Sequence, residues 1–197
     1  MKAIVFVDVQ NDFIKGGKLA FSYPEADNLP QVVEFAKDCV NSGNCKIYAT
    51  RDTHQPTTYL GYHFEGDKKV DTVSGGYLAS LEGQHLPVEH CIEGTDGWMI
   101  AYSLLDVLIG HATFVNKPTF GSYDLAGIVE EDFGKIGPEE IVICGYDLSI
   151  CVVANAVMLR AKYPDTKISV KLDLCGDVDK EAFDAAVKVL RMQQIEV

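Results

Sequence analysis

An α/β fold with a mostly parallel central sheet is predicted from two features of this 197-residue chain. Short apolar runs alternate with longer segments of helical periodicity, an order that is typical of βαβ units. Several of the apolar runs are continuous, as in strands that are buried on both faces of a sheet. The length favours one domain, so we expect residues 1–197 to fold as a single unit.

The first half of the chain carries two predicted strands and one helix. Residues 3–7 are a continuous apolar run, which indicates a buried strand. Residues 28–42 have apolar side chains along one helical face, and a polar segment around Gly43 ends this helix. Residues 46–50 are the second strand. The stretch 52–97 is rich in Gly, His, Thr and Pro, and a compact domain rarely keeps so long an irregular segment without a function such as a metal site or a lid.

Three strands and three helices are predicted in the second half. The strands cover residues 112–115, 140–144 and 167–172, and the second of them is the most apolar. The helices cover residues 123–134, 149–163 and 179–192. Pro164 ends the middle helix, and Asp179 caps the last one.

The composition excludes several classes of partner. The chain has 17 Lys and Arg against 29 Asp and Glu, a net charge of −12. This charge argues against a nucleic-acid partner, which needs a basic face, and against docking on an anionic membrane. No leader-like segment precedes the first strand and no apolar run has the length of a membrane span, so we expect a cytoplasmic protein whose six cysteines are free thiols.

Polar residues follow four of the predicted strands. Asp8 follows the first strand, Asp52 and His54 follow the second, Lys117 follows the third, and Cys151 lies shortly after the fourth. Sites in open parallel sheets lie outside the carboxyl ends of the strands. We therefore expect these side chains to meet at one rim of the sheet.

Cys151 is the candidate nucleophile. It lies near the start of a predicted helix, where backbone N–H groups and the helix dipole stabilise a thiolate and the oxyanion of a tetrahedral intermediate. Asp8 has the right chemistry to take the thiol proton, and Lys117 to offset the negative charge. Cysteine is otherwise a common core residue, and that is the interpretation for Cys39, Cys45, Cys144 and Cys175.

The stretch 52–97 contains a candidate metal site. Asp52 and His54 are two residues apart, so in extended chain both point to one side. His63 and His90 lie farther along the same stretch. Imidazole and carboxylate ligands suit a divalent ion such as zinc, iron or manganese.

Five segments resemble one known family over nearly the whole chain, in the right order. They are residues 4–13 (IVFVDVQNDF), 51–54 (RDTH), 90–97 (HCIEGTDG), Lys117 with 120–123 (FGSY), and 145–152 (GYDLSICV). These segments are similar to the isochorismatase-like cysteine hydrolases, and most of all to the nicotinamidase/pyrazinamidase branch. The resemblance implies a three-layer α/β/α sandwich and a small-molecule amide as substrate, with a homo-oligomer as an option.

The resemblance also implies roles for individual residues. Asp8, Lys117 and Cys151 would form the catalytic triad, and the backbone N–H groups of Asp147 and Cys151 the oxyanion hole, with a cis peptide bond before Asp147. Phe13, which would stack on an aromatic substrate ring, and Tyr146 would bind the substrate. The metal ligands would be Asp52, His54 and His90, with His63 as a candidate fourth, and zinc is the first expectation, ahead of iron or manganese.

Three features depart from the family pattern. Leu148–Ser149 stand where the family usually has Thr-Asp, Leu86 stands where a Trp is frequent, and the stretch between His63 and His90 is long. These departures bear on the substrate, so another small-amide or ureido hydrolase remains the alternative to a nicotinamidase. Two further alternatives are a binding protein with an inactive site and a thiol redox protein, although the chain has no C-x-x-C motif.

Overall fold

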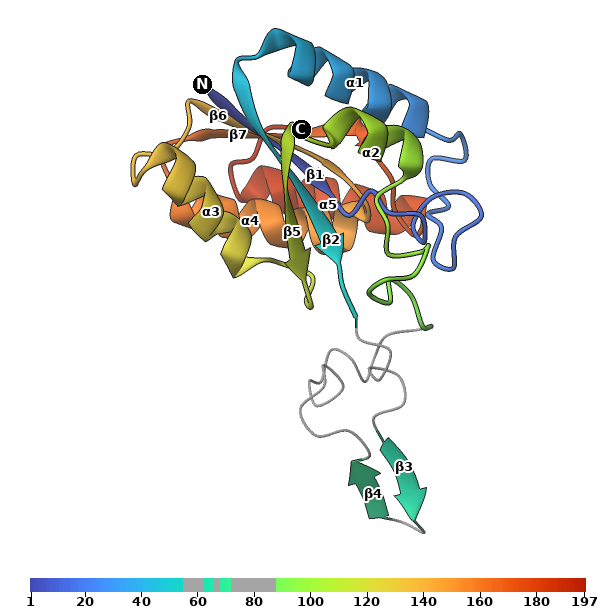
Figure 1. The fold of residues 1–197 in the computed structure, drawn as a ribbon. Coiled ribbons are helices and arrows are strands. Elements are labelled where there is room, and N and C mark those ends of the chain that lie inside the picture. Colours follow the sequence, from blue (N-terminus) through green and yellow to red (C-terminus); the bar gives the residue numbers. More distant parts are fainter. Residues whose placement is uncertain (55–61, 66–67, 72–87) are drawn as a thin grey trace.

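The computed structural model describes residues 1–54, 62–65, 68–71 and 88–197, with side chains in the first and last of these ranges. Its centre is a parallel sheet with the strand order β5-β2-β1-β6-β7 (Figure 1). The strands are β1 (Lys2–Val7), β2 (Cys45–Asp52), β5 (Ala112–Lys117), β6 (Glu140–Gly145) and β7 (Lys167–Cys175). The predicted α/β fold with a parallel sheet is confirmed.

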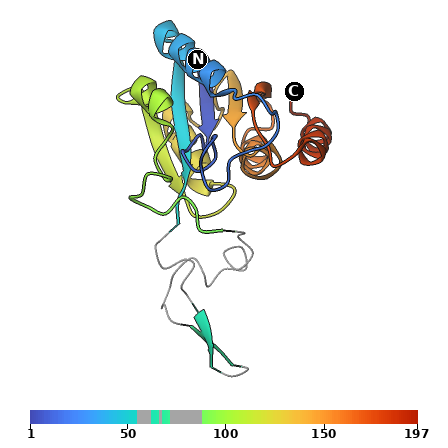
Figure 2. The same ribbon diagram turned by 90° about the vertical axis from the view of Figure 1, so that its right-hand side faces the viewer.

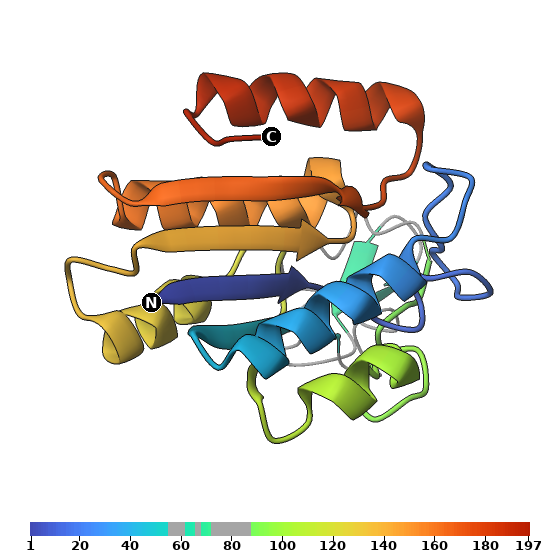
Figure 3. The ribbon, with the colours of Figure 1, turned by 90° about the horizontal axis from the view of Figure 1, so that it is seen from above.

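Helices cover both faces of this sheet. One face carries α1 and α2, and the other carries α3 and α4, with α5 packed beside α4 (Figures 2 and 3). The helices are α1 (Leu29–Ser42), α2 (Tyr102–Leu108), α3 (Tyr123–Phe133), α4 (Val153–Lys162) and α5 (Lys180–Met192). None of the described helices is long and apolar enough to cross a membrane.

The register of the sheet brings the carboxyl ends of its strands together. Val7 at the end of β1 pairs with Gly145 at the end of β6. On the other side of the sheet centre, Asp52 at the end of β2 pairs directly with Lys117 at the end of β5. The residues that follow these positions therefore emerge at one edge, as the strand-end rule requires.

Three features of the fold differ from the prediction. Helix α2 was not predicted, because its two turns bury only Leu104 and Leu108 and give a weak periodic signal. The stretch 52–97 is not wholly irregular, since β3 (Tyr62–Glu65) and β4 (Lys68–Asp71) form an antiparallel pair. The predicted helix 149–163 is a π-helical turn, η3 (Leu148–Val152), that continues directly into α4.

Gly145 makes the turn that follows β6, and we expect Gly145→Ala to destabilise the fold. Its φ of +127° disfavours any side chain, and an added Cβ would lie 2.0 Å from the carbonyl oxygen of Val7. The backbone strain alone costs about 1–3 kcal/mol, and the contact with β1 adds to that loss. Urea unfolding measures the change. Gly110→Ala is the matched control, because Gly110 also has a positive φ but open space around its Cβ position, and an equal loss in both variants would contradict the role of the Val7 contact.

Candidate active site

Asp8 is held at the end of β1 by the neighbouring strand. Its backbone is in the left-handed region, with φ of 49°, which is uncommon for a residue other than glycine and recurs at functional sites. The Asp8 N–H donates to the backbone oxygen of Thr50, and the Thr50 hydroxyl donates to Asp8 Oδ1 at 2.6 Å. Strand β2 therefore fixes the Asp8 carboxylate, and leaves Oδ2 directed at a different neighbour.

That neighbour is Lys117, which is fully buried and contacts Asp8, Asp52 and Cys151. Its Nζ lies 2.6 Å from Asp8 Oδ2 and 3.4 Å from Asp52 Oδ1. Nζ also donates to Cys151 Sγ at 3.5 Å and to the backbone oxygen of Thr119 at 3.1 Å. One ammonium group thus joins the ends of β1, β2 and β5 to the π-helical turn that carries Cys151.

The electrostatics of this cluster favour an uncharged thiol that has a base beside it. Burial raises the pKa of Cys151, and Asp8 and Asp52 raise it further against the effect of Lys117. Burial likewise raises the pKa of Asp8, although Lys117 lowers it. A carboxylate with a raised pKa is a better proton acceptor. Burial lowers the pKa of Lys117, but Asp52 and Asp8 outweigh it and keep the lysine charged.

A group of metal-ligand side chains lies next to this cluster. Donor atoms of Asp52, His54 and His90 lie within 4.8 Å of one another, and all three residues are buried. Nε2 of His54 is 3.0 Å and Nε2 of His90 is 3.2 Å from Asp52 Oδ2. The second ring nitrogen of His90 lies 2.7 Å from the backbone oxygen of Val88, the outer hydrogen bond that orients metal-binding histidines. The donor set therefore fits a divalent transition metal. His63 lies in β3, whose side chains fall outside the described part.

Two buried residues that sequence analysis did not single out position this metal-ligand group. Gln10 accepts from the Asp52 N–H at 2.7 Å and donates to the Asp52 backbone oxygen at 2.9 Å. Asp12 accepts from the Cys91 N–H at 2.7 Å, which holds Cys91 at a φ of 46° directly after His90. In the sequence, the run of polar residues that follows the first apolar strand was the signal that could have identified both Gln10 and Asp12.

The segment from Gly145 to Val152 forms the turn that presents Cys151. The peptide bond between Tyr146 and Asp147 is cis, as the family resemblance implied. The Tyr146 side chain does not line the cavity beside Cys151, because it is fully buried and its hydroxyl donates to Asn28 Oδ1 at 2.7 Å. Ser149, which stands where the family usually has Asp, donates through its N–H and its hydroxyl to the carboxylate of Asp177, each at 2.8 Å.

A cavity of about 550 Å³ opens onto Cys151. Phe13 lines it, with its ring edge-on to His90 at a centroid distance of 5.7 Å. The wall combines the polar residues of the site with a mostly apolar remainder. The residues that line it include Phe13, Asp52, His90, Phe120, Asp147, Ile150, Cys151 and Val178. Such a mixture suits a small planar substrate with a few polar groups.

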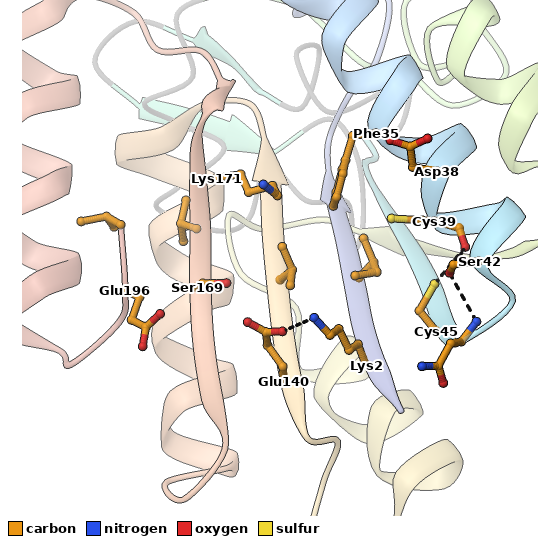
Figure 4. A pocket seen from close by; sticks show the side chains of 15 residues that line it. Lys2, Phe35, Asp38, Cys39, Ser42, Cys45, Glu140, Ser169, Lys171 and Glu196 are labelled. Atoms are coloured by element: carbon orange, nitrogen blue, oxygen red, sulfur yellow. Dashed lines mark hydrogen bonds and ion pairs between the residues drawn. The ribbon is translucent and has the colours of Figure 1, made fainter.

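A second cavity, of about 620 Å³, lies far from this chemistry. It faces α1 and the beginnings of the strands, where Lys2 forms an ion pair with Glu140 at 2.6 Å (Figure 4). Cys39 and Cys45 line it, but Asp8, Lys117 and Cys151 do not. We therefore assign the candidate active site to the cavity at the carboxyl ends of the strands.

The fold and the site together define an α/β protein in which a buried Cys, Asp and Lys adjoin a metal-ligand group. The family described as "Isochorismatase domain" matches residues 2–197, and the chain belongs to this family. The resemblance noted in the sequence is confirmed.

Several known proteins that resemble the chain are nicotinamidases or pyrazinamidases by name. It is 25% identical to the nicotinamidase of Escherichia coli over 97% of this chain and 90% of that protein. It is 26% identical to the nicotinamidase/pyrazinamidase of Mycobacterium tuberculosis over 100% of this chain and 98% of that protein. The structure of a Pyrococcus horikoshii pyrazinamidase in complex with zinc has a TM-score of 0.74 at 21% identity, covering 99% of this chain and 97% of that one.

Proposed function

We propose that this protein is a metal-containing cysteine amidohydrolase that converts nicotinamide to nicotinate and ammonia. One observation carries the proposal: a single buried lysine contacts both Asp8 and Cys151, at 2.6 and 3.5 Å, and Cys151 lines a cavity of small-molecule size. The named relatives are nicotinamidases and pyrazinamidases that match the whole chain. The alternative is a related small-amide or ureido hydrolase that uses the same three residues.

The reaction we propose proceeds through a thioester on Cys151. Asp8 takes the thiol proton as Sγ attacks the amide carbon, and the N–H groups of Asp147 and Cys151 hold the oxyanion. Asp8 then protonates the departing ammonia, and the thioester remains. A water molecule, whose proton passes to Asp8, attacks the thioester and releases the acid. The Cys151 thiolate that leaves then takes this proton back from Asp8, which restores the starting state. Lys117 stabilises the negative charge that Asp8 and Cys151 share through this cycle.

Substrate orientation is assigned to the cavity wall and to the metal-ligand group. Phe13 would stack on the pyridine ring, since it lines the cavity that also contains Cys151. A divalent ion held by Asp52, His54 and His90, which we propose is zinc, would supply a Lewis-acid centre for the ring nitrogen. Such positioning contributes several kcal/mol to catalysis, about 7–11 in favourable cases.

The proposal is tested by measuring ammonia and nicotinate release from nicotinamide, with metal content determined on the same purified sample. Equal amounts of both products are expected. Release from other small amides but not from nicotinamide would instead support the related-hydrolase alternative. A folded, metal-loaded protein that releases ammonia from no amide and forms no acyl adduct on Cys151 would rule the proposal out.

His90→Ala is expected to weaken metal binding by about 100-fold or more, because loss of an outer-sphere partner alone costs 10–100-fold. Metal content after dialysis measures the change, and a chelator should lower the unfolding temperature of the wild type but hardly that of the variant. His111→Ala is the control, because His111 is exposed at the opposite end of β5. Undiminished metal content in His90→Ala would refute the assignment. The same assay on His63→Ala decides whether His63 is the fourth ligand.

A further inference from the structure

One buried carboxyl group at the active site has no partner. Asp147 is 7% exposed, and its Oδ1 is buried without a hydrogen-bond donor among the described residues. Burial raises the pKa of Asp147 to about 8, and the charges of Asp177 and Asp8 contribute in the same direction. A buried polar atom without a partner is costly, and in native proteins it calls for an explanation.

The other buried aspartates of the described part are all satisfied. Asp8 and Asp52 pair with Lys117, and Asp12 accepts the N–H of Cys91. Asp177 accepts two hydrogen bonds from Ser149. Each of these buried carboxylates therefore has an ion pair or a hydrogen bond within the protein, whereas Asp147 has neither among the described residues.

The position of Asp147 indicates what its partner is. Asp147 lines the cavity that contains Cys151, and Lys18, Ile150 and Val178 line the same cavity. Its own backbone N–H is one of the two groups that we assign to the oxyanion. The Asp147 carboxyl group is thus close to the place of the reacting carbonyl. A substrate bound there would supply the hydrogen-bond donor that the described part of the protein does not.

We propose that Asp147 is a specificity-determining residue that binds a hydrogen-bond donor on the acyl part of the substrate. Among the small aromatic carboxamides that the proposed function covers, we expect those with an amino group near the reacting carbonyl to be preferred. This inference rests on the proposed amide hydrolysis at Cys151. An amino group satisfies the carboxyl group in either protonation state, because a carbonyl or carboxylate oxygen accepts its N–H. Plain nicotinamide has no donor besides the amide that reacts, and leaves Asp147 unpaired.

The test compares matched pairs of amides that differ only in an amino group. The pairs are nicotinamide with 2-aminonicotinamide and benzamide with 2-aminobenzamide, and kcat/KM is measured for each. We expect the wild type to favour the amino compound by about 10-fold or more, because an unpaired buried polar group costs about 1–3 kcal/mol. In Asp147→Ala this ratio should fall to about 1, whereas Val178→Ala, in the same wall, should keep it.

Binding to Cys151→Ala separates this inference from the proposed function. Dissociation constants for the same pairs, with and without Asp147→Ala, report recognition without any turnover. If no amide is hydrolysed but the amino compounds bind about 10-fold tighter through Asp147, the proposed function fails, whereas recognition of the amino group by Asp147 is supported. If both members of each pair bind and react alike, or if the preference survives in Asp147→Ala, the inference is wrong. Asp147→Asn, which keeps an acceptor oxygen in the same place, should retain part of the preference.

Discussion

Replacing Cys151 with alanine is expected to lower kcat for amide hydrolysis by about 10⁴-fold or more, because the reaction loses its nucleophile. The side chain is small, so the variant should keep the fold. Among the cysteines of the described part, Cys151 is the one whose Sγ contacts Lys117 Nζ, at 3.5 Å. The measurement is ammonia release with excess enzyme, so that residual activity remains detectable.

A control variant and a second measurement show whether the loss of activity is specific to the Cys151 thiol. Cys175→Ala is the matched control, since Cys175 is also a buried thiol but lies at the end of β7 outside the cavity, and it should keep its activity. Mass spectrometry of the wild type quenched during turnover should show one acyl group on Cys151. Near-normal turnover in Cys151→Ala would eliminate the thioester pathway.

Lys117→Met should remove both activity and a large part of the stability. Removing one partner of a buried ion pair costs about 3–5 kcal/mol, because the remaining charges stay buried. Here Asp8 loses the contact at 2.6 Å and Asp52 the contact at 3.4 Å. Without Lys117 the pKa of Cys151 rises further, since the lysine is the group that lowers it. Urea unfolding and kcat measure the two effects.

A double variant separates the charge effect from the loss of packing. Lys117→Met with Asp8→Asn removes one of the two carboxylates that lose their contact with Lys117, so we expect it to recover part of the stability and none of the activity. Lys180→Met removes an exposed lysine that pairs with Asp184, and it should have little effect on either measurement. Stability of Lys117→Met equal to that of Lys180→Met would show that the buried cluster does not depend on the lysine charge.

Much of the fold and part of the site could be predicted because the signals are local. Apolar runs such as residues 140–144 identify the strands, and the order of elements predicts a parallel sheet. The strand-end rule then placed Asp8, Lys117 and Cys151 at one rim, where the structure has them in contact. The pair β3–β4 was missed although Gly66–Asp67 between its strands is a hairpin signal.

The sequence by itself determined that Asp8, Lys117 and Cys151 reach the site, because their positions depend on where each strand ends. Only the tertiary structure decided which hydrogen bonds hold these side chains in place and which of their polar atoms have a hydrogen-bond partner. The hydrogen bond from Cys91 to Asp12 joins residues 79 apart, and that from Gln10 to Asp52 joins residues 42 apart. The burial of Tyr146 away from the cavity and the unpaired carboxyl group of Asp147 depend likewise on packing between distant segments. A local pattern specifies backbone conformation and the buried face, but contacts of this range arise only when the sheet has assembled.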